Sequence, residues 1–148
     1  MTSSPPSLVT EHGFAAPAEA EAHFRTKLAF ETDPSDVQSD LAGGAADFVL
    51  VDARSAEAYA RGHVPGAINI PHRQMTRETL SRFAATTCFV VYCDGIQCNA
   101  STKGARRLSS FGFRVKEMIG GLDGWIRDGF PVHPAPEARA SVATCGCA

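Results

Sequence analysis

The residues with the clearest chemical potential lie in one short segment around Cys93. An apolar run over 88–92 ends at this cysteine, a turn-like segment with Gly95 and Asn99 follows, and a helical pattern begins near Ser101. In open α/β sheets ligands bind at the carboxyl ends of strands, and a helix start offers free N–H groups and partial positive charge. A thiol placed there can have its pKa lowered from about 8.5 to about 3.5–7.5. The spacing therefore predicts one reactive sulfur.

The loop that follows Cys93 is expected to surround this sulfur. Its backbone N–H groups would stabilise an anionic sulfur as an oxyanion hole does, and its residues are Asp94, Gly95, Ile96, Gln97, Cys98 and Asn99. Cys98 has three interpretations: a resolving thiol that forms a disulfide with Cys93, a helix-start residue without a role, or the nucleophile itself. The resolving role is favoured, because a nucleophile at 98 leaves too short a helix before Gly112.

Two further cysteines, Cys145 and Cys147, stand near the end of the chain. They could relay sulfur or exchange disulfides with Cys93, or belong to a tail without a role. The C-x-C and C-x4-C spacings differ from the C-x2-C pairs of zinc sites, and a metal would occupy the nucleophile. We therefore expect neither a metal nor a cofactor. Cys88, inside the apolar run, is expected to be a small core residue.

The remaining pattern alternates short apolar runs with helical segments. Strands are predicted at 48–51, 67–70, 88–92 and 113–118, and helices at 17–30, through Val37 and Leu41, at 56–59, 76–84, 101–110 and 122–127. Such alternation predicts an α/β fold with a parallel sheet covered on both faces. The predicted organisation is an extension with one helix (1–31), one domain (32–134) and a flexible tail with two cysteines (135–148).

Composition narrows the classes of function. A chain of 148 residues with 44% apolar residues can bury one ordinary core. The net charge of −2 comes without a basic stripe, so no nucleic-acid partner is expected. No charged leader with an apolar core is visible, and no run approaches the roughly 18 apolar residues of a membrane span. Five cysteines, an odd number, suit free thiols in a reducing cytoplasm. The oligomeric state is not indicated.

Three groups of residues, in chain order, resemble the signatures of rhodanese-type sulfurtransferase domains. They are DARSAEAY (52–59) with GHVPGAINIP (62–71), VVYC (90–93), and GGLDGW (120–125) with GFPV (129–132). The resemblance covers about residues 35–133. It implies a rhodanese-like α/β fold with a central parallel sheet of about five strands and helices on both faces. It also implies that Cys93 carries sulfane sulfur as a persulfide, taken from thiosulfate or a persulfide and passed to a thiol, cyanide or a protein acceptor.

The loop departs from the family pattern in two ways. It is longer than the usual six residues, and it contains Asp94 but no cation before Lys103. An arginine fork normally holds an oxyanion, so these departures favour a persulfide donor over thiosulfate. Two alternatives stay open. The long loop and Cys98 also suit a thiol-dependent oxyanion reductase or phosphatase-like enzyme, and a non-catalytic rhodanese-like module could bind a partner through the first helix.

Three polar residues outside the loop are expected to support it. Asp52, which ends a predicted strand, and Arg54 could form a buried pair that braces the cysteine loop. His63 lies between two glycines in a loop. It is expected to be a structural hydrogen-bonding group, because sulfur transfer from a thiolate needs no base.

Overall fold

A computed structural model describes residues 2–134, which form two compact units, 2–30 and 31–134. The first unit contains helix α1 (Pro17–Phe30), which has the predicted bounds. Pro17 suits the first helical position, where its missing N–H costs no hydrogen bond. The side chains of Phe24, Leu28 and Phe30 are exposed. The tail cysteines Cys145 and Cys147 lie outside the described residues.

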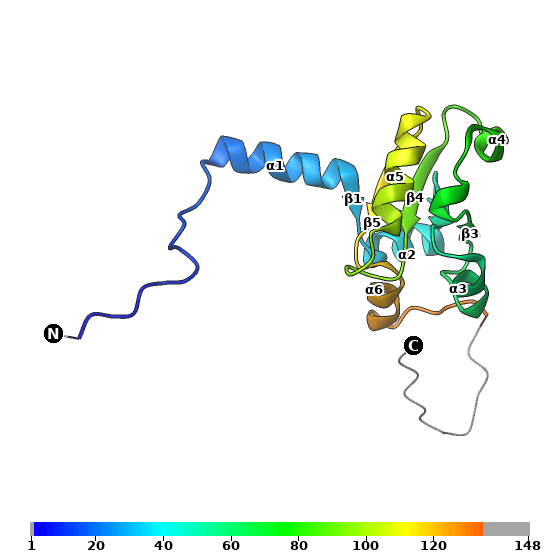
Figure 1. Cartoon of the computed structure of the whole chain (residues 1–148). Coiled ribbons are helices and arrows are strands. Elements are labelled where there is room, and N and C mark those ends of the chain that lie inside the picture. Colours follow the sequence, from blue (N-terminus) through cyan, green and yellow to red (C-terminus); the bar gives the residue numbers. More distant parts are fainter. Residues whose placement is uncertain (1, 135–148) are drawn as a thin grey trace, which may run out of the picture. The chain divides into compact units, whose positions relative to one another are not determined.

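The second unit is built on a five-stranded sheet in which every pairing is parallel, as predicted (Figure 1). The strand order is β1-β5-β4-β2-β3. Their bounds are β1 (Glu31–Thr32), β2 (Val49–Asp52), β3 (Ile68–Asn69), β4 (Cys88–Tyr92) and β5 (Arg114–Met118). Strand β1 consists of only two polar residues, so no apolar run in the sequence indicated it, and it was not predicted. The cysteine loop therefore follows the central strand, at its carboxyl end.

Helices cover both faces of this sheet. On one face α2 (Pro34–Gly43) and α6 (Gly121–Arg127) bury Val37 and Trp125 against side chains such as Leu50 and Tyr92. On the other face lie η1 (His72–Gln74), α4 (Arg77–Leu80) and α5 (Ala100–Ser110), and the core there contains Met75, Leu80, Phe89, Val91 and Leu108. Successive side chains of a strand point to opposite faces of the sheet, so strands such as β4 contribute residues to both cores. Figure 1 shows α5 running beside β4 and β5.

One predicted helix is much shorter in the structure. The segment 76–84 forms only the single turn α4, which Thr76 caps by accepting a hydrogen bond from the Thr79 N–H at 3.2 Å. The chain then turns toward β4, and Phe83 packs edge-on against Phe89 with ring centroids 5.0 Å apart. Phe83 is partly buried in this contact and lies beyond the end of α4. Cys88 is also only partly buried, because it opens β4 and does not lie in its middle.

Two further helices begin at a residue whose side chain caps them. Asp33 caps α2 through a 2.9 Å hydrogen bond from the Asp36 N–H, and Gly44 ends this helix with φ of 70°. Ser55 caps α3 (Ala56–Arg61). Within residues 2–134 we find no helix with both the length and the apolar character needed to cross a bilayer.

Gly121 lets α6 approach the cysteine loop closely. Its φ is +56°, a region that favours glycine, and an added Cβ would collide with the carbonyl oxygen of Cys93. This closeness permits two hydrogen bonds, Leu122 N–H to Cys93 O at 2.9 Å and Asp123 N–H to Asp94 O at 2.8 Å. The first residues of the loop are thereby fixed by α6.

We expect Gly121→Ala to destabilise the fold by about 1–3 kcal/mol, the usual cost of a strained backbone position, and to displace the loop. Urea unfolding measures the first effect, and amide chemical shifts of residues 93–95 measure the second. Gly43→Ala is the matched control, because nothing lies within 4 Å of its added Cβ. Equal stability of the two variants would contradict the close packing of α6 on the loop.

Candidate active site

Cys93 directly follows β4, and its side chain is buried, with 2% of its surface exposed. Its sulfur faces the loop and the start of α5. The Sγ atom lies 3.2 Å from the carbonyl oxygen of Cys98, 3.2 Å from Ser101 Oγ and 4.0 Å from the carbonyl oxygen of Gly95. The predicted nucleophile therefore lies inside the curl of backbone that follows it, and the sheet and α5 together hold it there.

Ser101 connects this sulfur to a carboxylate. Its hydroxyl, which is buried, donates to Glu117 Oε2 at 3.0 Å, and Thr102 Oγ1 donates to the same oxygen at 3.0 Å. Glu117 belongs to β5 and pairs with Val91 of β4 in the sheet register. The sequence analysis missed Ser101 and Glu117. Ser101 could have been found as the inward residue of the helix start, whereas Glu117 depends on the strand register, which no local motif reveals.

The expected lowering of the Cys93 pKa is wrong. Burial raises the pKa of the thiol, and the Cys98 thiol adds to this effect, while the hydroxyl and backbone N–H of Ser101 act in the opposite direction. The loop amides also differ from expectation. Carbonyl oxygens of Gly95 and Cys98 face the sulfur, and the Cys98 N–H is used by Gly95 O at 3.1 Å. A turn with its carbonyls inward favours the neutral thiol, which can donate to them.

The pocket in front of Cys93 is small and has no cationic lining. Its volume is about 190 Å³. Its described lining includes the carboxylate of Glu117 and no lysine or arginine; the lining residues are Cys93, Gly95, Ile96, Cys98, Ser101, Thr102, Glu117, Met118, Ile119, Gly120 and Gly121. A carboxylate at this position repels an approaching dianion. The described lining of this pocket therefore offers an oxyanion no cationic side chain.

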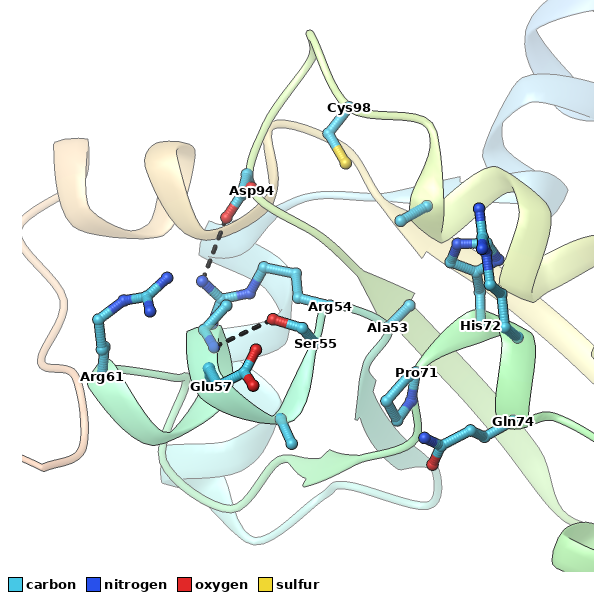
Figure 2. Close-up of a pocket in the computed structure, with 14 residues that line it drawn as sticks. Ala53, Arg54, Ser55, Glu57, Arg61, Pro71, His72, Gln74, Asp94 and Cys98 are labelled. Carbon is cyan, nitrogen blue, oxygen red and sulfur yellow. Dashed lines mark hydrogen bonds and ion pairs between the residues drawn. The ribbon is translucent and has the colours of Figure 1, made fainter. Parts of the chain in front are cut away.

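Asp52 and Arg54 form a buried ion pair that also reaches the cysteine loop. Arg54 Nη2 lies 2.7 Å from Asp52 Oδ2. Arg54 Nη1 lies 3.1 Å from Asp94 Oδ1, the contact marked by a dashed line in Figure 2. Burial acts to lower the pKa of Arg54, but hydrogen bonds and charges of the two carboxylates outweigh it and raise that pKa. The guanidinium thus stays charged and holds the side chain of Asp94. Backbone N–H groups of α6 hold the backbone of the same loop.

His63 makes structural contacts. Its Nδ1 hydrogen-bonds with the Tyr59 carbonyl at 2.8 Å, and its ring stacks on Tyr59 with centroids 3.7 Å apart. His63 is not among the residues that line the Cys93 pocket. The backbone of His63 also exchanges two hydrogen bonds with the backbone of His133, at 2.9 and 2.8 Å. The contacts of His63 are therefore those of a structural group.

The outer part of the loop is open. Ile96 at its tip is exposed, Gln97 Nε2 donates to Asp123 Oδ2 at 3.2 Å, and Asn99 precedes α5 without a side-chain capping bond. Cys98 is partly exposed, and it is close enough to Cys93 to affect the pKa of that thiol. Across residues 2–134, no three His, Cys, Asp or Glu side chains are grouped to hold a metal ion.

The fold and the motifs around this site agree with comparisons to known proteins. The family model for the Rhodanese-like domain matches residues 33–128, so this chain belongs to the rhodanese-like domain family. In structure it resembles the BH2092 protein from Bacillus halodurans, with 39% identity and a TM-score of 0.77 over 80% of this chain and 86% of that one. It also resembles the rhodanese-like domain of the Alr3790 protein from Anabaena sp., with 26% identity and a TM-score of 0.63 over 77% and 91% of the two chains.

Two curated relatives have different descriptions. The HTH-type transcriptional regulator Rv0324 of Mycobacterium tuberculosis is 35% identical over 60% of this chain, a match that spans only 38% of the regulator. The chloroplastic thiosulfate sulfurtransferase 16 of Arabidopsis thaliana is 28% identical over 55% of this chain and 76% of that protein. This chain is therefore similar to parts of one protein described as a regulator and one described as an enzyme.

The hydrogen bonds around Cys93 predict opposite effects of two substitutions. Ser101→Ala removes the hydroxyl that lies 3.2 Å from the sulfur and lowers the pKa of Cys93. That pKa should therefore rise further, and alkylation at neutral pH should slow by about 2- to 10-fold, the worth of one hydrogen bond. Glu117→Gln removes a negative charge and leaves the Ser101 hydroxyl with a weaker acceptor. This hydroxyl can then donate more readily to the sulfur, so alkylation should become faster. Peptide-resolved iodoacetamide labelling against pH measures both.

Thr102→Val is the control for this experiment, because Thr102 contacts Glu117 but is not hydrogen-bonded to the sulfur. It should leave the labelling profile of Cys93 near that of the unmodified chain. Slower labelling in the Glu117→Gln variant would instead mean that Glu117 accepts the proton of Cys93, and the interpretation of a thiol held neutral would be wrong.

Proposed function

We propose that this protein is a sulfurtransferase that carries sulfane sulfur as a persulfide on Cys93. The observation that carries the proposal is the placement of the Cys93 sulfur inside its own loop, against Ser101 at the start of α5 and beside a small pocket. Membership of the rhodanese-like family supports it, as does the likeness to a protein described as a thiosulfate sulfurtransferase.

The proposed reaction has two steps. In the first, the Cys93 sulfur attacks the outer sulfur of a persulfide R–S–SH; a new S–S bond forms, the donor S–S bond breaks, and the Cys93 proton goes to the leaving thiolate. In the second, a thiol or cyanide attacks the outer sulfur of Cys93–S–SH, and Cys93 returns as the leaving group. The Ser101 hydroxyl and N–H lie at the sulfur and would stabilise its anionic form.

A persulfide is the proposed donor, since it carries less charge on its reacting end than thiosulfate. The carboxylate of Glu117 in the pocket wall and the absence of a lysine or arginine among its described lining support this choice. The cytoplasm is the proposed place of action, because the chemistry needs reduced thiols and Cys88, Cys93 and Cys98 are free. The acceptor is proposed to be a small thiol or a thiol on another protein.

The competing function is a rhodanese-like module that binds a partner without catalysis. The likeness to a protein described as a transcriptional regulator favours this alternative. The two functions differ in their need for the Cys93 sulfur. A binding module tolerates loss of this thiol, whereas the enzyme does not.

Sulfur loading distinguishes the two functions. After incubation with glutathione persulfide, we expect one added sulfur on the Cys93 peptide by mass spectrometry, and its removal by cyanide. Cys93→Ser should abolish loading, because its hydroxyl cannot form the persulfide. Cys88→Ser is the matched control and should load normally. Cys98→Ser should also load, since a resolving thiol acts after the persulfide has formed. Full transfer by Cys93→Ser would contradict the proposal.

A further inference from the structure

A second, larger hollow shares Cys98 with the Cys93 pocket. Its volume is about 680 Å³, within the range of sites that bind small organic ligands. The β2–α3 connection with α3 forms one wall, residues 71–74 form another, and Asp94, Cys98 and Ala100 close it at the cysteine loop. Figure 2 shows Cys98 on the loop at the rim, with its sulfur directed into this hollow, which we call the Arg61–Arg73 cleft.

The charges in this cleft are mixed, with cations in excess. Arg54 is committed to Asp52 and Asp94, but within residues 2–134 neither Arg61 nor Arg73 forms an ion pair, and both are exposed. Glu57 adds one carboxylate to the lining. The cleft therefore offers two guanidinium groups for carboxylates and one carboxylate for an ammonium group.

His72 adds a polar group to the same wall. Its Nδ1 atom is buried and has no hydrogen-bond partner within the described residues. Burial lowers the pKa of His72, and Lys103, Arg73 and Arg107 lower it further, so the ring is neutral at pH 7. These three cations also show that positive charge gathers around the 71–74 wall. A bound molecule with carboxylates would be attracted there.

Cys98 connects the cleft to the site of chemistry, because it lines both the cleft and the Cys93 pocket. The two spaces differ in size and charge. The small pocket suits one or two sulfur atoms, whereas the cleft is large enough for an organic group attached to them. A ligand whose body fills the cleft would have its sulfur delivered at Cys98, next to Cys93.

We propose that the Arg61–Arg73 cleft binds the body of a low-molecular-weight thiol or its persulfide that carries amino-acid charges, namely carboxylates with an ammonium group. Arg61 and Arg73 hold the carboxylates, Glu57 holds the ammonium group, and the ligand sulfur lies beside Cys98 at the entrance to the Cys93 pocket. This inference rests on the proposed sulfurtransferase function, for which it names the class of donor or acceptor.

A binding experiment tests the site without requiring catalysis. The Cys93→Ser chain is titrated with S-methylglutathione, an unreactive probe with two carboxylates and an ammonium group. We expect saturable amide shifts at residues 54–61 and 71–74, and weaker binding as salt is added. The double variant Arg61→Gln/Arg73→Gln should bind about fivefold more weakly or worse, as expected for two partly solvated ion pairs.

The matched control is Arg82→Gln. Arg82 is equally exposed but lies over the Phe83 ring, 4.8 Å from its centroid, and does not line the cleft. This control should bind the probe as the parent does, and methyl 2-hydroxyethyl sulfide, which has no charges, should not bind. The proposal is overturned if no saturable shift appears up to about 10 mM probe, a free energy of only about −3 kcal/mol. It is also overturned if the double variant binds as well as the control.

Failure of this inference is distinct from failure of the proposed function. Normal sulfur loading of Cys93 together with no probe binding removes the cleft as a site and leaves the sulfurtransferase intact. Probe binding in the cleft without loading of Cys93 retains the site and removes the transfer reaction.

Discussion

Everything at this site depends on two hydrogen bonds from α6 to the start of the cysteine loop. The N–H groups of Leu122 and Asp123 bind the carbonyls of Cys93 and Asp94, and Gly121 makes that approach sterically allowed. Arg54 holds the side chain of Asp94 from the other side, anchored by the fully buried Asp52. With the backbone carbonyl of Cys93 directed to α6, its side chain is left to face Ser101 at the start of α5.

This constraint gives a buried sulfur that is neutral at rest. Burial and inward carbonyls favour the thiol, which donates to Ser101 Oγ at 3.2 Å, while the hydroxyl and backbone N–H of Ser101 act to lower the pKa of Cys93. A neutral, shielded thiol is poorly reactive toward oxidants, because the thiolate is the reactive form. In the proposed sulfur transfer, the substrate enters the small pocket and its leaving sulfur accepts the proton of Cys93. In this account, the site selects substrates by their access to the small pocket, and the Cys93 thiol is not permanently activated as a thiolate.

The sequence predicted the framework well because the framework is local. The buried strand before Cys93 and the Asp52–Arg54 pair both follow from short patterns of residue type. The site was harder. The orientation of the peptide groups in 94–99 depends on turn conformation, and the contact of Ser101 with Glu117 depends on the β4–β5 register, so neither is written in a local pattern. The lowered pKa was expected from helix-start electrostatics, which burial outweighed.

The most direct test of the account is a crystal structure of the chain after treatment with glutathione persulfide. The account predicts one additional sulfur bonded to Cys93 Sγ, inside the small pocket and within hydrogen-bonding distance of Ser101. Additional sulfur on Cys98 or Cys88, with Cys93 unchanged, would contradict it.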